Sequence, residues 1–399
     1  MAIIFVDPVG QYATGDLTEL WTQAYDTPSG TAVMPTVDTT GSRRSGRCLL
    51  FDTTSGTPRT LSKTLAVSGT TGYYGFAFKA SGNFSNLRTL SAGSGDSIWP
   101  GAGFISTEVP INAIAAFRNL HYTQVALSIN TNGTLAAILG DAATITGLSG
   151  IDSPITTVTG ATSTRALLTD QWYFIEWELT THASAGTCKV YVNEELWINV
   201  TGVQTTANNG GAAGLTEICL GQLRVSSSPA GGLQWRYHDI RLIDTNTSDQ
   251  DNDLAATQGD LAIEVVSPTA DGAMVDWTPN SGVTHYTRVD EIPPNDDTDY
   301  NQSSTANQID TFATGGVPIA GATIVSAGVM YSARRVNSGP SKTQPVFRIG
   351  GTNYTIGSEI GNTSTYSYHQ AFVNKKPSNH VAWSAAEFAA AEPGYKKTA

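Results

Sequence analysis

The stretch WYFIEWELTTHASAGTCKVYVNEELWINVTG, residues 172–202, decides the fold predicted for this chain. It contains three apolar runs, WYFIEWEL (172–179), CKVYVN (188–193) and ELWINVTG (195–202). A polar segment with Ser, Ala and Gly separates the first two runs, and Glu194 separates the last two. Short aromatic and β-branched runs bounded by such residues predict antiparallel strands joined by tight turns.

Further runs of strand length recur on both sides of this stretch. They are CLLFDT (48–53), GYYGFAFKA (72–80), VALSIN (125–130), TLAAILG (134–140), EICLGQL (217–223), YHDIRLID (237–244), LAIEVVSP (261–268), DTFAT (310–314), ATIVSAGVMYSARR (322–335), QPVFRIGG (344–351) and TNYTIGS (352–358). Helical signals appear only in SAAEFAAAEPG (384–394), where Ser384 and Glu387 form a capping box and Pro393 ends the run. The sequence therefore predicts an all-β protein with one short helix near its end.

The length and composition divide the chain into two domains. Its 399 residues exceed the usual size of one hydrophobic core, and only 14% of them are charged. The acidic, polar segment 246–259 contains almost no large apolar side chain and is expected to be a linker. We therefore predict a large β domain over residues 1–245 and a smaller β domain over residues 260–399.

Charge argues against a nucleic-acid partner, because the net charge of −12 offers no basic surface to phosphates. The local exception is the cluster of Arg43, Arg44 and Arg47. We expect it to be a solvated loop; the alternative is a docking site for an acidic neighbouring subunit.

The cysteines and the apolar segments exclude several other classes. Cys48, Cys188 and Cys219 form an odd set without CxxC spacing, which supports neither a disulfide framework nor a zinc site. Cys188 and Cys219 are expected to be small buried apolar residues. The N-terminal MAIIFVDPVGQY lacks a basic leader, and no stretch reaches the ~20 apolar residues of a membrane span. We expect synthesis in a cytoplasm and no membrane insertion.

Glycoside hydrolysis needs a pair of carboxylates on one face of a cleft. The nearest pair is Glu176 and Glu178, which share a strand face but have no third acid in register. We expect both to be solvent-facing strand residues, with Trp177 toward the core. No metal-binding histidine spacing or nucleophile motif is present either, and the sequence predicts that the chain is not an enzyme.

Two kinds of binding site remain. Aromatic side chains that flank Asn and Asp suit a sugar, and the candidates are Tyr73, Trp99, Trp197 and Trp235; the alternative is that they fill the core. Asp296, Asp297 and Asp299 are the candidate ligands for calcium, against an alternative of solvated acidic loops. No other cofactor is predicted.

The stretch 170–202, followed by WRYHDIRLID (235–244), resembles the jelly roll of concanavalin A and laminin-G domains. The resembling pieces are a Trp-bearing strand, a turn, a strand that ends in Asn and a closing strand. This resemblance implies a jelly-roll sandwich for residues 1–245.

The second domain resembles a module of tailed-bacteriophage virion proteins. The resemblance rests on TADGAMVDWTPNSGVTHYTRVDEIPPNDDTDYN (269–301), the preceding Gly-Asp and the final VAWSAAEF segment (381–388). It implies a place in a virion assembled in the host bacterial cytoplasm, with other virion proteins as partners. We also expect a homo-oligomer, with a trimer favoured, because such symmetry suits a particle appendage.

Together these features predict a non-enzymatic virion structural protein. It would be a decoration or appendage on the tail, collar or capsid surface that contacts host surface glycans. The alternative is a carbohydrate-binding adhesin or a polysaccharide-degrading enzyme built on the jelly-roll scaffold.

Overall fold

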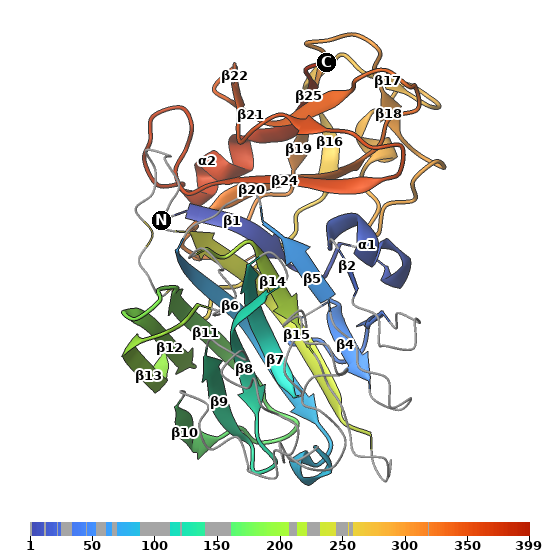
Figure 1. Cartoon of the computed structure of the whole chain (residues 1–399). Coiled ribbons are helices and arrows are strands. Elements are labelled where there is room, and N and C mark those ends of the chain that lie inside the picture. The colour runs from blue at the N-terminus through green and yellow to red at the C-terminus, as the bar shows by residue number, and fades with distance from the viewer. Residues whose placement is uncertain are drawn as a thin grey trace. The chain divides into compact units, whose positions relative to one another are not determined.

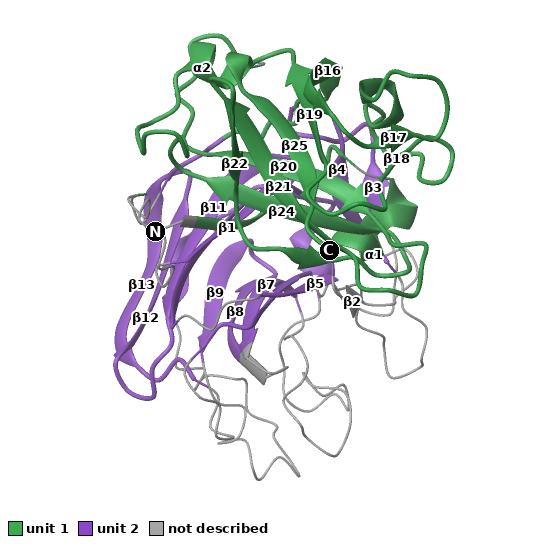
Figure 2. Ribbon diagram, turned by 90° about the horizontal axis from the view of Figure 1, so that it is seen from above, with its two compact units in different colours: residues 1–20, 247–255, 262–399 green, residues 21–246, 256–261 purple. Residues whose placement is uncertain are grey.

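The computed structural model describes most of the chain. The described residues are 2–11, 13–21, 23–24, 34–44, 46–52, 61–65, 70–87, 112–119, 122–139, 161–206, 214–221, 232–244, 254, 258–317 and 319–399. The chain separates into two compact units (Figure 2). Unit 1 comprises residues 1–20, 247–255 and 262–399, and unit 2 comprises residues 21–246 and 256–261.

Unit 2 is a jelly-roll sandwich of two antiparallel sheets (Figure 1). Sheet A runs in the order β13 (Glu195–Val203), β12 (Gly186–Val192), β11 (Trp172–Thr180), β6 (Thr71–Ser81), β15 (Gln234–Asp244), β4 (Cys48–Asp52) and β3 (Thr36–Asp38). Sheet B runs in the order β10 (Thr162–Ala166), β9 (Thr134–Leu139), β8 (Tyr122–Ile129), β7 (Ala113–Asn119), β14 (Glu217–Leu220), β5 (Leu61–Thr64) and β2 (Gln23–Ala24).

Aromatic side chains fill the space between the two sheets. Phe117 of sheet B packs against Trp177 and Tyr74 of sheet A, with ring centroids 4.9 and 5.5 Å apart. The Tyr237 hydroxyl donates to the Ile114 carbonyl of the opposite sheet at 2.8 Å, which satisfies a polar group inside this core. All of these side chains are fully buried. The sandwich core thus confirms the predicted fold class and the inward direction of Trp177.

The β12–β13 hairpin shows how the sequence sets the local structure. Val192 pairs with Glu195, so Asn193 and Glu194 form a two-residue loop, and both have positive φ. That conformation suits a type I′ turn, for which Asn is a favoured residue. The Asn193 side chain also accepts the Phe174 backbone N–H at 2.8 Å, which ties the hairpin to β11.

Unit 1 is the smaller β-sandwich. Its main sheet runs in the order β16 (Pro268–Val275), β19 (Ile309–Thr314), β25 (Glu392–Lys397), β21 (Lys342–Ile349) and β22 (Thr352–Thr355), with β23 (Ile360–Gly361) also paired to β21. The pair β20 (Ala327–Ala333) and β24 (Ser367–Val373) packs on it through a core that includes Val329, Phe347 and Trp383. The pair β17 (Thr278–Pro279) and β18 (Asn301–Gln302) joins the interior of the Thr269–Asn301 run to its end.

The predicted helix is present as α2 (Ala385–Ala390). The Ser384 hydroxyl accepts the Glu387 N–H, and the Glu387 carboxylate accepts the Ser384 N–H at 3.1 Å, which completes the capping box. The helix is shorter than the predicted run, because residues from Glu392 onward form β25.

Two sequence-based boundaries differ from the structure. Residues 1–20 belong to unit 1, where β1 (Ala2–Asp7) and α1 (Leu17–Leu20) lie against β24, and the Tyr368 hydroxyl donates to the Gln11 carbonyl. The run 261–267 forms no strand; the strand begins at Pro268. Both misplacements concern short apolar runs, whose strand partners a sequence does not reveal.

Candidate functional site

One row of polar and aromatic side chains crosses the outer face of sheet A. Cross-strand pairing places Tyr73 opposite Glu178, Glu178 opposite Lys189, and Lys189 opposite Asn199. Their chain neighbours, such as Tyr74, Trp177 and Val190, are buried in the core. Because side chains alternate along a strand, the row lies on the face away from that core.

Two further aromatic residues adjoin this row. Tyr191 follows Lys189 by two positions on β12 and is partly exposed, as is Trp197 on β13. The register shifts between Val190 and Tyr191, which places the extra residue of a bulge, Trp197, beside Tyr191. The name "aromatic face" is used below for this set of residues: Tyr73, Glu178, Lys189, Tyr191, Trp197 and Asn199.

An ion pair between Lys189 and Glu178 lies at the centre of the aromatic face. The Lys189 ammonium donates to the Glu178 carboxylate at 3.0 Å, and this hydrogen bond raises the pKa of Lys189. Burial and then the Glu178 charge raise the pKa of Tyr73, so its hydroxyl stays protonated. The aromatic face therefore presents a neutral phenol, an ammonium, a carboxylate and an amide side by side.

A buried ion pair lies next to the aromatic face. The Arg241 guanidinium of β15 reaches the Glu176 carboxylate of β11 at 2.8 Å, across the intervening strand β6. Gly75 of β6 leaves room for it, since a Cβ there would meet the Arg241 guanidinium carbon at 3.2 Å and Phe174 at 3.0 Å. The guanidinium stacks on the Phe174 ring at 4.5 Å.

The segment 258–260 closes over this pair. The backbone N–H groups of Gln258 and Gly259 each donate to a Glu176 oxygen at 2.9 Å, and the Gly259 carbonyl accepts from Arg241 at 2.5 Å. Three donors thus compensate the buried Glu176 carboxylate, as a charge in the interior requires. This arrangement corrects the expectation that Glu176 faces solvent.

Asp260 ends this segment between two arginines. Its carboxylate forms a two-pronged ion pair with Arg43 and lies 3.6 Å from Arg44. Asp239 of β15 lies behind them, 3.6 Å from Arg43 and 3.4 Å from Arg44. Burial lowers the pKa of Arg43, but the hydrogen bond and charge of Asp260 outweigh it and raise that pKa overall. Arg43 and Arg44 are therefore paired within unit 2, not free in a solvated loop as expected.

The name "arginine cluster" is used below for this second set. It consists of Arg43, Arg44 and Arg241 with the carboxylates of Glu176, Asp239 and Asp260. Arg43 and Arg44 were predicted to lie in a solvated loop or, alternatively, to dock an acidic neighbouring subunit, and Arg241 was not among the candidate residues. The strand register, with Glu176 and Arg241 both opposite Gly75, brings these two members together.

The predicted sugar-binding residues separate into three groups. Tyr73 and Trp197 belong to the aromatic face. Trp235 is fully buried and packs edge-on against Phe78 in the core, so the alternative expectation holds for it. Trp99 lies outside the described residues. Tyr191 and Lys189 were missed, although the strict alternation in CKVYVN marks them as the outward positions.

The predicted calcium ligands point to different partners. Asp297 pairs with Arg334 and accepts the Tyr366 hydroxyl, whereas Asp299 pairs with Arg288. Burial and then the charge of Asp16 raise the pKa of Asp296. Over the described part of the chain, no three His, Cys, Asp or Glu side chains gather in a metal-binding arrangement.

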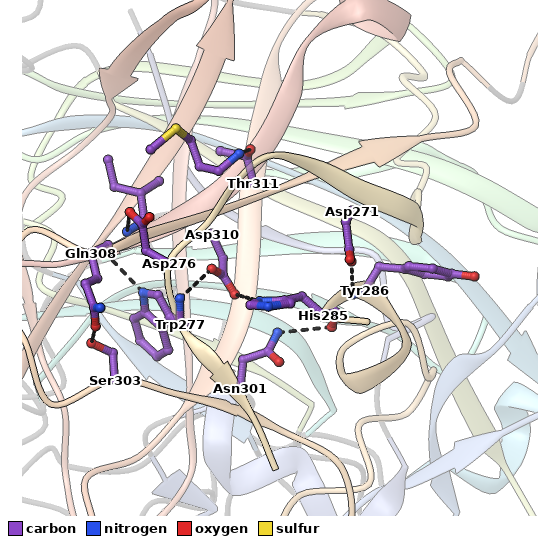
Figure 3. A network of polar contacts seen from close by, with 12 residues as sticks. Asp271, Asp276, Trp277, His285, Tyr286, Asn301, Ser303, Gln308, Asp310 and Thr311 are labelled. Atoms are coloured by element: carbon purple, nitrogen blue, oxygen red, sulfur yellow. Dashed lines mark hydrogen bonds and ion pairs between the residues drawn. The ribbon is translucent and has the colours of Figure 1, made fainter. Parts of the chain in front are cut away.

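In unit 1 a second polar network centres on Asp310 of β19 (Figure 3). Its carboxylate contacts His285 Nδ1 at 2.8 Å and accepts the Trp277 N–H at 2.9 Å. The Trp277 indole N–H donates to the Gln308 carbonyl at 3.2 Å, and its ring packs on Tyr395. The network thus ties His285 and Trp277 to β19 by hydrogen bonds.

Similarity to known proteins is found among solved structures. No family model and no curated protein matches the chain. Similar solved structures include an endo-β-1,4-glucuronan lyase from the fungus Trichoderma reesei, 12% identical, covering 61% of this chain and 96% of that one with a TM-score of 0.40. An alginate lyase of polysaccharide lyase family 7 is 13% identical and covers 62% of this chain and 100% of its own, with a TM-score of 0.36.

A third match is a structure from work on the cell entry of botulinum neurotoxin type C, which depends upon interaction with two ganglioside molecules. It is 9% identical and covers 88% of this chain and 89% of that one, with a TM-score of 0.31. At such identities and TM-scores, the matches assign no substrate or activity to this chain. The prediction that the chain is not an enzyme is nevertheless overturned, because two of these similar structures are polysaccharide lyases.

Within the described ranges, no helix combines the length and the hydropathy that a bilayer crossing requires.

Proposed function

We propose that this chain is a carbohydrate-binding protein and that a glycan lies on the aromatic face of unit 2. The observation that carries the proposal is the partial exposure of Tyr73, Tyr191 and Trp197 on the outer face of sheet A. The core aromatic residues of the same strands, such as Tyr74 and Trp177, are by contrast fully buried.

The chemistry of the aromatic face suits a sugar. Aromatic rings cover the apolar C–H faces of pyranose rings. The Lys189 ammonium and the Asn199 amide donate hydrogen bonds, and the Glu178 carboxylate accepts them, which matches the hydroxyl groups of a glycan. The Glu178–Lys189 pair holds these groups in register before a ligand arrives, which lowers the entropy cost of binding.

The test is a glycan array followed by titration calorimetry with the strongest ligand. Tyr191→Ala should weaken binding by about tenfold, which corresponds to ~1.4 kcal/mol, because it removes an aromatic anchor. Tyr354→Ala is the matched control, since Tyr354 is a partly exposed tyrosine of unit 1 outside the aromatic face. Equal affinity in both variants, or no array ligand at all, would refute the proposal.

We further propose, on the resemblance of the second domain, that the chain is carried on a bacteriophage particle with the jelly roll available to host surface glycans. The run 269–301 supports this proposal. Immunogold labelling of purified particles tests it: gold on the particle is expected, and unlabelled particles from a lysate that contains the protein would exclude it. Cross-linking on the particle would show whether the predicted trimer forms.

A further inference from the structure

The arginine cluster contains a carboxylate that the chain itself supplies from a separate segment. Asp260 reaches Arg43 with both carboxylate oxygens, in the fork-to-fork geometry by which arginine recognises carboxylates. Its side chain is one-third exposed, whereas the Asp239 side chain behind it is fully buried. Asp260 is therefore the most exposed of the three carboxylates in the cluster.

The charges of the cluster balance only while Asp260 is in place. Three arginines, Arg43, Arg44 and Arg241, face three carboxylates, Glu176, Asp239 and Asp260. His238 lies 3.1 Å from Asp239 and adds positive charge when protonated. Without Asp260 the cluster holds three guanidinium groups and two carboxylates, so one positive charge is left for an incoming anion.

One arginine also has a side-chain nitrogen that makes no hydrogen bond. Arg241 is 2% exposed, and its Nη1 atom is buried and makes no hydrogen bond, although Nη2 is bound to Glu176 and the Gly259 carbonyl. A buried guanidinium nitrogen without an acceptor costs free energy, because it has lost its hydrogen bonds to water and gained none in the protein. An oxygen-rich ligand that displaced Asp260 would supply that acceptor.

The arginine cluster adjoins the aromatic face. Cross-strand pairing places Arg241 opposite Gly75, Gly75 opposite Glu176, and Glu176 opposite Tyr191. Three strand spacings of roughly 4.8 Å separate the Arg241 and Tyr191 backbones, a span of about 14 Å. A short oligosaccharide that stacks on Tyr191 can therefore reach the arginines along the same sheet surface.

From these observations we infer that the arginine cluster is a subsite for the carboxylate of an acidic sugar, and that Asp260 occupies it as an intramolecular substitute. The inference rests on the proposed function, which it deepens by naming the ligand class: glycans that contain uronate or another carboxylated sugar. Such a glycan displaces Asp260 from Arg43 and Arg44, and its carboxylate restores the charge balance.

A matched pair of ligands tests the inference. Cellotetraose and tetraglucuronate share a β-1,4-linked backbone and differ in the C6 carboxylates. Asp260→Asn removes the internal competitor, so tetraglucuronate should bind this variant about tenfold more tightly than the wild type, while cellotetraose affinity should change less than twofold. Asp170→Asn is the control: it makes the same charge change at an exposed turn of unit 2. It should alter neither affinity.

A second variant guards against a folding defect in the first. Arg44→Gln should weaken tetraglucuronate binding in the wild-type background as well as cancel the gain of Asp260→Asn. Absence of tetraglucuronate binding to Asp260→Asn, or an equal gain for both tetrasaccharides, would overturn the inference. If array ligands bind in a Tyr191-dependent manner while Asp260→Asn gives no gain, the inference fails alone; if no Tyr191-dependent ligand exists, the proposed function fails.

Discussion

Two buried carboxylates, Asp310 of unit 1 and Glu176 of unit 2, look alike in isolation but lie in different surroundings. Asp310 is held by the His285 ring and the Trp277 N–H. Glu176 is held by Arg241 and by the backbone N–H groups of residues 258 and 259. Each carboxylate has the partners that a buried charge needs, so burial and full pairing alone do not distinguish a structural site from a binding site.

The surroundings make the difference. The aromatic rings near Asp310 pack inward: Trp277 lies edge-on against Tyr395, which itself packs against Phe312 and Tyr331. Beside Glu176, by contrast, Tyr191 is partly exposed, and a segment remote in sequence supplies two of the three donors. A region whose pairing comes from a replaceable segment and whose aromatic rings face outward is suited to a ligand. The Asp310 network is suited to fixing the Thr269–Asn301 run.

The largest effect is expected at Asp310. Asp310→Ala leaves the buried His285 ring and the Trp277 N–H without their acceptor, and we expect a loss of about 3 kcal/mol in the free energy of unfolding of unit 1. Urea denaturation followed by tryptophan fluorescence measures it. Asp276→Ala, an exposed neighbour that accepts one backbone N–H, is the control and should cost under ~1 kcal/mol. If Asp310→Ala leaves the free energy of unfolding unchanged and lowers glycan affinity instead, the structural role given to Asp310 is wrong.

A smaller loss is expected at Gly75. Gly75→Ala introduces a Cβ against Phe174 and the Arg241 guanidinium, and the crowding should cost about 1–2 kcal/mol in unit 2. Gly315→Ala serves as the control, because a Cβ at Gly315 meets no atom within 4 Å. Thermal unfolding of both variants makes the comparison. An unperturbed Gly75→Ala protein would show that Arg241 does not depend on the open path over β6.

The smallest effect is a pH dependence in unit 1. Burial raises the pKa of Glu19 to about 7 from an ordinary 4.5, with a hydrogen bond from Ser332 opposing and the charges of Asp296 and Asp16 adding. The folded state therefore binds a proton more tightly than the unfolded state, so the free energy of unfolding falls as pH rises from 4.5 through 7. Because Glu19 is half-buried, solvent screening limits the effect to roughly 1 kcal/mol.

Glu19→Gln keeps an acceptor for Ser332 but cannot ionise. The variant should raise the free energy of unfolding at pH 8 by roughly 1 kcal/mol. It should also flatten the dependence of that free energy on pH between pH 4.5 and 7, as measured by denaturation at a series of pH values. A steeper slope in the variant would contradict the assignment. Burial also raises the pKa of Asp310, where the hydrogen bonds of His285 and Trp277 oppose it.

The sequence predicted the parts of the fold that depend on local pattern. The strands of 172–202 follow from alternation and turn residues, and the α2 capping box follows from the spacing of Ser384 and Glu387. The run 261–267 carries the same apolar signal, yet it forms no strand, because a strand needs a partner as well as a pattern. Pairing partners are set by tertiary structure, which also placed residues 1–20 in unit 1.

The candidate site was predictable only where it follows alternation. Tyr73 and Trp197 were identified, but Trp235 was named as a sugar-binding candidate, with the core as the alternative, although it alternates with the outward-facing Arg236. The pairing of Glu176 with Arg241, 65 positions away, depends on a glycine in the strand between them. Nothing in either residue's neighbourhood in the sequence indicates that contact.

The most direct test of the central claim is a crystal structure of the chain with the strongest oligosaccharide ligand from the glycan array. The sugar is expected over Tyr73, Tyr191 and Trp197, with any carboxylate next to Arg43 and Arg44. A ligand bound to sheet B or to unit 1, with the aromatic face empty, would contradict the account.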